Sequence, residues 1–146
     1  MKLSKKSRYG FRALIDLMIH SREGQVTLAS IAERNNISPQ YLEQVFGGLR
    51  RGGIVNSVKG PNGGYMLAKE AEGITLAMVI EALEGTYLLE DENTSDGKDM
   101  IVATLQAVVV DGINRQNSAF LNHITLLDLR KDYEHRSGTV EDMYFI

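Results

Sequence analysis

The stretch SPQYLEQVFGGLRRGGIVNSVKGPNGGYML, residues 38–67, combines a strong helix signal with a hairpin signal. Ser38 followed by Pro39 is typical of a helix start, because a serine hydroxyl caps free backbone N–H groups and proline suits the first helical position. The helix is predicted to run to about Arg51, and Gly52-Gly53 supplies a left-handed stop. Its expected inward face consists of Leu42, Val45, Phe46 and Leu49.

Two strands are predicted directly after this helix. Residues 54–58 and 65–67 are rich in β-branched, aromatic and other apolar side chains, and a glycine-rich turn joins them. Another helix is predicted before Ser38, capped by Thr27 and reaching about Arg34. Helix, helix and hairpin in this order predict a winged helix-turn-helix, so the expected fold class is mainly α with a small β-hairpin.

The rest of the chain is predicted to be helical around one acidic loop. An amphipathic helix is expected over residues 7–21, and Thr75 caps another. Residues 100–121 predict a long apolar helix, and Thr125 starts a short one that leads to a polar tether at 134–138. The predicted organisation is a winged helix-turn-helix DNA-binding domain over 1–85, an acidic loop over 86–98, a dimerisation helix and short helix over 99–138, and a C-terminal tail over 139–146.

The long helix carries more apolar surface than one side of an isolated terminal helix can hide. We therefore interpret it as a dimerisation helix, in preference to a helix that folds back on its own domain. The candidate dimerisation residues are Ile101, Leu105, Val108, Val109, Ile113 and Phe120.

Charge divides the chain into two unlike halves. Residues 1–69 contain eleven Lys/Arg against four Asp/Glu, a net charge of +7. Residues 70–146 contain five Lys/Arg against fifteen Asp/Glu, a net charge of −10. A basic half beside an acidic half is typical of a polyanion-binding module with a separate interaction or regulatory segment, although uneven solvated surface is the simpler alternative.

Composition excludes several classes of site. The 146 residues contain no cysteine, so disulfides, thiolate metal sites and a thiol nucleophile are excluded. His20, His123 and His135 lack metal-ligand spacing, and neither a GxSxG elbow nor an NTPase phosphate loop occurs. We expect no enzyme activity, no cofactor and no metal site. No apolar run approaches the roughly 18 residues of a membrane span, and we expect a cytoplasmic protein.

The second helix of the predicted pair has the composition of a DNA-reading helix. In a winged helix this element enters the major groove, and its N-terminal side chains reach base edges. Gln pairs with adenine, Glu accepts from cytosine, and Tyr or Ser contacts phosphates or a thymine methyl. Ser38 could equally serve only as the cap, and Tyr41 could be packing. The candidates are Ser38, Gln40, Tyr41, Glu43 and Gln44.

The hairpin tip, Lys59 to Gly64, fits a wing that approaches the DNA backbone. Gly60, Gly63 and Gly64 permit positive φ angles and let N–H groups approach a phosphate, while Lys59 suits the narrower minor groove. The alternative is a tight hairpin that simply needs glycine. Candidate phosphate anchors elsewhere are Lys5, Arg8, Arg50 and Arg51, and we count Thr27 among the DNA-binding candidates.

Three stretches, SKKSRYGFRAL, ISPQYLEQVFGGLRRGGIV and KGPNGGYML, resemble the Rrf2 family of bacterial winged-helix regulators, of the IscR, NsrR and CymR type. The match is specific over residues 1 to about 85. It implies a cytoplasmic homodimer that represses transcription from partly palindromic promoter sites, and it adds Pro39 to the DNA-reading positions. The usual wing residue of the family is arginine, so Lys59 departs from a forked, bidentate contact.

A second departure concerns the loop at about residues 86–99, where sensors of this family carry three cysteines and this chain has none. The resemblance therefore lies with the cysteine-free, CymR-like branch and implies control of cysteine or sulfur metabolism without an iron–sulfur cluster. The ending VEDMYFI resembles tails that dock into cysteine synthase. We expect Tyr144, Phe145 and Ile146 to bind that enzyme, with packing on the protein's own dimer as the alternative.

Two other functions remain open on the same fold. A protein-interaction module would bind little DNA of its own. An effector-binding regulator would have a pocket between the long helix and the winged domain. Charge asymmetry favours DNA binding over the first, and the sequence does not discriminate the second.

Overall fold

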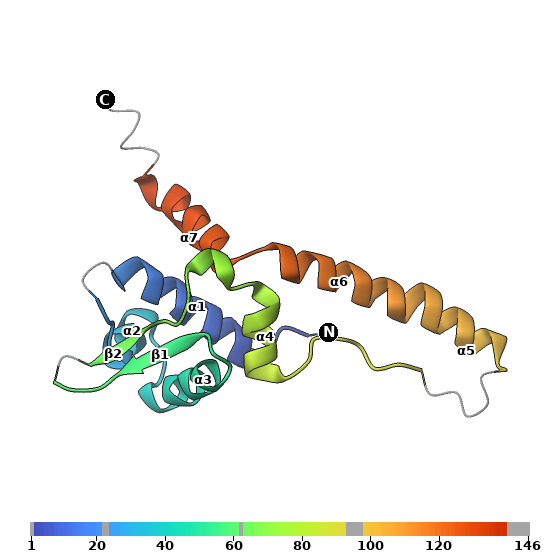
Figure 1. The fold of residues 1–146 in the computed structure, drawn as a ribbon, viewed down its shortest axis with the longest axis horizontal. Helices are drawn as coiled ribbons and strands as arrows, with labels where there is room; N and C mark the ends of the chain where they lie inside the picture. The colour runs from blue at the N-terminus through green and yellow to red at the C-terminus, as the bar shows by residue number, and fades with distance from the viewer. Residues whose placement is uncertain (1, 22–23, 62, 93–97, 140–146) are drawn as a thin grey trace.

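The protein was analysed as a computed structural model, which describes residues 2–21, 24–61, 63–92 and 98–139. The C-terminal residues Tyr144, Phe145 and Ile146 lie outside this described part. Helices α1 to α4 and a small hairpin form one body, a long helix leaves that body, and α7 lies over the side of it opposite α3 (Figure 1).

The first three helices each begin at a side-chain cap. Helix α1, Lys5–His20, starts two residues before the predicted position because the Ser4 hydroxyl accepts the Ser7 N–H at 3.2 Å. Thr27 caps α2, Leu28–Asn35, and Asn36 ends that helix with a left-handed φ of 54°. Ser38 caps α3, Pro39–Arg51, as predicted.

The hairpin consists of β1, Val55–Val58, and β2, Gly64–Leu67, paired antiparallel with Val55 opposite Leu67. A further bridge joins Val26 to Tyr65 through two backbone hydrogen bonds of 2.9 and 2.8 Å. The wing is therefore fastened to the segment that leads into α2. Together the helix pair and the hairpin confirm the predicted winged helix-turn-helix.

The glycines of this region serve two different purposes, and the sequence separates them only partly. Gly53 and Gly60 have positive φ, 76° and 112°. Gly53 thus provides the left-handed stop predicted at Gly52-Gly53, whereas the positive φ expected at the wing glycines 63 and 64 was wrong. Gly52, Gly63 and Gly64 all lack positive φ. A Cβ at these three would lie 2.4 to 2.5 Å from Ala82 Cβ, Val58 O or Val26 O, so glycine is needed there for close approach.

One core joins the winged domain to the short C-terminal helix. Phe46 is fully buried and packs edge-on against Tyr65 of β2, with 4.9 Å between ring centroids. A 3₁₀ turn, Ala71–Gly73, leads to α4, Leu76–Glu84. Helix α7, Leu126–Glu134, contributes the fully buried Leu126 to the same core. Helix α7 therefore packs on the winged domain through Leu126.

A buried carboxylate locks α1 against α2. Asp16 is 7% exposed and accepts three hydrogen bonds from the Arg34 guanidinium, whose Nη2 lies 2.7 Å from Oδ1. Asn35 Nδ2 donates a further bond of 3.0 Å. Hydrogen bonding to Asp16 raises the pKa of Arg34 above its ordinary value. The carboxylate is thus both paired and hydrogen-bonded, as burial of a charge requires.

The predicted long helix spans residues 100–123 in three parts. These are α5, Met100–Thr104, a π-helical segment, Leu105–Val110, and α6, Asp111–His123. After α7 a π-helical turn, His135–Thr139, takes the place of the predicted polar tether. No described helix combines the length and apolar character needed to cross a membrane.

We expect Gly52→Ala to destabilise the fold by about 1 to 3 kcal/mol, because its new Cβ would overlap Ala82 and well-packed sites tolerate added volume poorly. Urea unfolding measures the effect. Gly73→Ala is the matched control, since its Cβ would meet nothing within 4 Å. Combining Gly52→Ala with Ala82→Gly should restore part of the loss. Equal stability of the two single variants would contradict this account.

Candidate nucleic-acid interface

The face of α3 that points away from the core carries most of the predicted reading residues. Leu42, Val45, Phe46 and Leu49 are fully buried. Because the helix repeats every 3.6 residues, this stripe turns the intervening positions outward. Gln40, Glu43, Gln44 and Arg50 are accordingly exposed.

The start of α3 presents Ser38, Pro39 and Gln40 to the solvent. The Ser38 hydroxyl accepts the Tyr41 N–H at 3.3 Å and donates to Gln40 Oε1 at 3.0 Å. Ser38 therefore performs the cap function that was the alternative to a DNA contact. Its second bond holds the Gln40 side chain at the helix start.

Tyr41 is half-buried. Two residues near it, Tyr9 and Arg12, were not among the predicted DNA-binding residues. The Tyr41 ring meets Tyr9 of α1 edge-on, with 5.7 Å between centroids. Lys5 Nζ lies 5.3 Å and the Arg12 guanidinium carbon 5.1 Å from the Tyr9 ring centroid. Arg12 Nη2 also donates to Asn35 O at 2.8 Å. Cation–π contacts and this bond fix two cations beside α3.

The spacing of these α1 residues could have indicated from the sequence that they lie together. Positions 5, 9 and 12 are four and three apart and so share one helix face. Arg8 lies outside this group, and its Nε donates to Leu3 O at 3.2 Å. Arg8 therefore supports the chain before α1 in the unbound protein.

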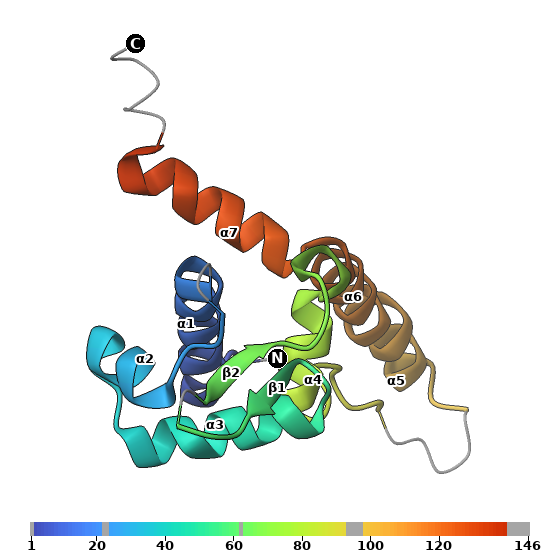
Figure 2. The ribbon, with the colours of Figure 1, turned by 60° about the vertical axis from the view of Figure 1, so that its left-hand side comes forward.

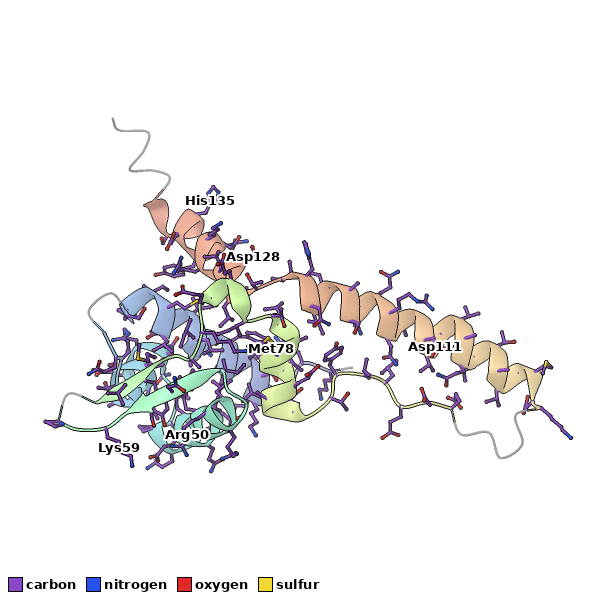
Figure 3. All side chains as sticks on the ribbon, viewed as in Figure 1. Arg50, Lys59, Met78, Asp111, Asp128 and His135 are labelled. Atoms are coloured by element: carbon purple, nitrogen blue, oxygen red, sulfur yellow. The ribbon has the colours of Figure 1, made fainter. Side chains whose placement is uncertain are left out.

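The wing contributes exposed residues near its tip. Lys59, Gly60 and Pro61 are exposed, whereas Gly63 and Gly64 are half-buried. Figure 3 shows Lys59 and Arg50 along the lower edge of the winged domain, whereas Asp111 lies on the long helix, Asp128 on α7 and His135 directly after α7. Thr27 is exposed as the cap of α2. Lys59 and Arg50 thus lie on the side opposite α7.

The acidic loop is bound to the long helix by polar side chains. Asn114 Oδ1 accepts the Leu89 N–H at 2.8 Å, and its Nδ2 donates to Leu89 O at 3.2 Å. Tyr87 Oη lies 2.8 Å from Ser118 Oγ. Gln106 Oε1 accepts the Glu92 N–H at 2.6 Å. Hydrogen bonds to the long helix therefore fix residues 87–92.

The candidate dimerisation residues are all exposed in the single chain. Exposure reaches 82% for Ile101, 70% for Val108 and 59% for Phe120. Leu105, Val109 and Ile113 are also exposed. The long helix therefore has one exposed apolar row and one polar row that contacts its own loop.

The sequence of the chain is similar to those of known transcriptional regulators. The Rrf2 family profile, described as iron-dependent transcriptional regulator, matches residues 3–132. The regulator IscR of Yersinia pseudotuberculosis is 41% identical over 133 residues, 88% of this chain and 79% of the relative. IscR of Pectobacterium atrosepticum is 42% identical over 138 residues, covering 92% and 82%.

Solved structures of transcriptional regulators have a similar fold. CymR, the global cysteine regulator of B. subtilis, has a TM-score of 0.76 and 36% identity, covering 90% of this chain and 97% of that chain. T. potens IscR has a TM-score of 0.73 and 38% identity, covering 93% and 90%. With a capped recognition helix beside a glycine-rich wing, the chain belongs to the Rrf2 family of DNA-binding transcriptional regulators.

Proposed function

We propose that the protein is a homodimeric, sequence-specific transcriptional repressor that works without an iron–sulfur cluster and controls cysteine or sulfur metabolism. The observation that carries this proposal is the exposed row of Gln40, Glu43 and Gln44 on a helix whose other face is buried, next to a wing bearing Lys59. This row lies in the half of the chain with a net charge of +7. Phosphates attract that half, and base edges select the register.

The side chains divide into two roles in this proposal. Gln40, Glu43 and Gln44 read base edges in the major groove. Lys5, Arg12 and Arg50 neutralise phosphates, and the wing residues Lys59 and Gly60 approach the minor groove. Tyr9 acts as a positioning residue, because its ring carries two of these cations and abuts Tyr41.

The absence of a cluster rests on the donors present. The family description names iron, yet the 146 residues contain no cysteine, so the loop over 86–98 supplies no thiolate. Within the described ranges, no group of three His, Asp or Glu side chains could hold a metal ion. The side-chain oxygens of Asn114 and Gln106 accept the N–H groups of Leu89 and Glu92. These residues do not fit a thiolate-bound cluster.

The remaining segments complete the proposal. The winged domain over 1–85 binds DNA, and the long helix within 99–138 forms the dimer through its exposed apolar residues. Similarity to the cysteine regulator CymR over 90% of the chain supports the assigned pathway class. The tail over 139–146 binds cysteine synthase in this scheme.

The purified protein should select DNA from a random pool. The expected product is a partly palindromic motif with half-site centres about one helical turn, roughly 34 to 36 Å, apart, because a two-fold dimer presents two recognition helices. Sequencing of the enriched DNA measures motif, symmetry and spacing together. A pool that stays random at low ionic strength would contradict sequence-specific binding.

Gln44→Ala and Lys5→Ala should weaken DNA binding in different ways. Loss of Gln44 should remove base preference at one position and cost about 1 to 3 kcal/mol on the selected motif only. Loss of Lys5 should weaken matched and random duplexes alike and lower the salt slope by about one. Fluorescence anisotropy at several salt concentrations measures both. Lys131→Ala, an exposed cation on α7, is the control and should change neither.

Ile146→Asp should reduce binding to cysteine synthase at least about tenfold, since it would place a charge in a contact proposed to be made by apolar tail side chains. Calorimetry with the purified enzyme measures the affinity. Ile146→Leu keeps the apolar character and is the matched control. Unchanged affinity of the Ile146→Asp variant would contradict a role of the tail in this interaction.

A further inference from the structure

A cavity of about 570 Å³ lies between the end of α1 and α7. Figures 1 and 2 both show α7 passing over this end of α1. Small-molecule sites commonly have volumes of roughly 300 to 1,000 Å³, so the space suits a ligand. Its lining includes Met18, Ile19 and Ser21 near the end of α1, and Arg130, Tyr133 and Glu134 of α7.

A second cavity, of about 400 Å³, adjoins the first. The two share Met18, Ser21 and Arg130, and the second extends to Leu67 of β2 and to Lys69. Arg130 therefore lines both spaces. The two together, named here the α7 cavities, connect α7 with the base of the wing.

The Arg130 guanidinium has hydrogen-bonding capacity that the protein leaves unused. Arg130 Nε is buried and has no hydrogen-bond partner among the described residues. Glu134 Oε1 lies 3.6 Å from this Nε, which makes an ion pair but is too long for a hydrogen bond. Arg34, in contrast, donates three hydrogen bonds to Asp16. Because buried donors are nearly always paired, Arg130 lacks an acceptor that a ligand would supply.

The charges that line the α7 cavities indicate the chemical class of this ligand. Arg130 and Lys69 are cationic, and Glu134 and Glu70 are anionic. A simple anion would be repelled by the two carboxylates, and a simple cation by the guanidinium and the ammonium group. A molecule that carries both a carboxylate and an ammonium group finds a partner of opposite charge for each. The buried Met18 offers an apolar contact to the rest of the molecule.

We propose that the α7 cavities bind a small metabolite of the amino-acid class. Its carboxylate accepts a bidentate pair of hydrogen bonds from Arg130, as the planar guanidinium favours. Its ammonium group donates to Glu134, which lies close enough to Arg130 for one small molecule to reach both. The ligand thus replaces the long Arg130–Glu134 contact with two charge-assisted ones.

A ligand at this position contacts the residues that hold the wing. Leu67 belongs to β2, and Ser21 O accepts the Gly24 N–H at 3.0 Å in the segment that leads to Val26. Val26 pairs with Tyr65 of β2, whose ring packs on α3. We therefore expect the ligand to change the affinity for the operator, an effect that rests on the proposed function.

Calorimetry and thermal unfolding with the twenty standard L-amino acids test the binding site itself, without DNA. At least one amino acid should bind the wild-type protein and raise its melting temperature, since a ligand of the folded state stabilises that state. The matched amine, which lacks the carboxylate, and the matched carboxylic acid, which lacks the ammonium group, should each bind at least about tenfold more weakly. Binding of none of the amino acids would overturn the proposal. Equal binding of the acid analogue would overturn the ligand class.

Variants on α7 locate the bound amino acid. Arg130→Met keeps most of the side-chain volume, removes the guanidinium and should lower the affinity at least about tenfold. Glu134→Gln should weaken binding of the amino acid but not of the acid analogue. Lys131→Met removes an exposed cation of α7 that lines neither cavity and is the matched control. Circular dichroism establishes that the variants are folded. Wild-type affinity in Arg130→Met would place the ligand elsewhere and overturn the proposal.

Fluorescence anisotropy on the selected operator tests the coupling to DNA. A saturating concentration of the amino acid should change the operator affinity of the wild-type protein at least about fivefold and leave that of Arg130→Met unchanged. Binding of the amino acid without any change in operator affinity would overturn the regulatory role. Failure to bind DNA both with and without the amino acid would instead contradict the proposed function, while calorimetry still reports on the cavities.

Discussion

The buried side of α3 is the constraint on which the rest of the structure depends. Its four apolar residues, 0% exposed, fix the rotation of the helix about its own axis. Phe46 extends this constraint to the wing, because its ring packs on Tyr65 of β2. The recognition helix and the wing are therefore held as one unit, and neither can turn its outer residues without breaking the core. Packing of the buried stripe therefore sets which residues of α3 are exposed, among them Gln40, Glu43 and Gln44.

Local signals made this part of the fold predictable. Ser38, Thr27, Thr75 and Thr125 each accept a backbone N–H three residues ahead, so each cap is contained within four residues of sequence. The apolar period of α3 and the strands of the hairpin are equally local. The start of α1 was placed late, since Ser4 precedes the apolar pattern and Lys5 and Lys6 mask the helix signal.

Contacts between distant segments could not be predicted in the same way. Gly52 meets Ala82, and Gly64 meets Val26, so their lack of side chains reflects partners roughly 30 to 40 residues away. Arg12 is held beside α3 by its contact with the Tyr9 ring and its hydrogen bond to Asn35 O, and the second partner lies 23 residues away in the sequence. Asn114 accepts a hydrogen bond from the Leu89 N–H, and no repeat in the sequence indicates this contact between residues 25 apart. In each case a tertiary contact assigns the residue's role.

The long helix carries a polar row that contacts the chain's own loop and an exposed apolar row. Gln106, Asn114, Ser118 and Asn122 recur at multiples of four residues, and their side chains hold the loop from Tyr87 to Glu92. Val110, also in this series, is buried. The exposed series Ile101, Leu105, Val109 and Ile113 is displaced from it by one residue, about 100° around the helix. The polar series is hydrogen-bonded to the chain's own loop, whereas the apolar series is exposed to solvent. Hydroxyl and amide side chains of the long helix thus make the attachment of residues 87–92.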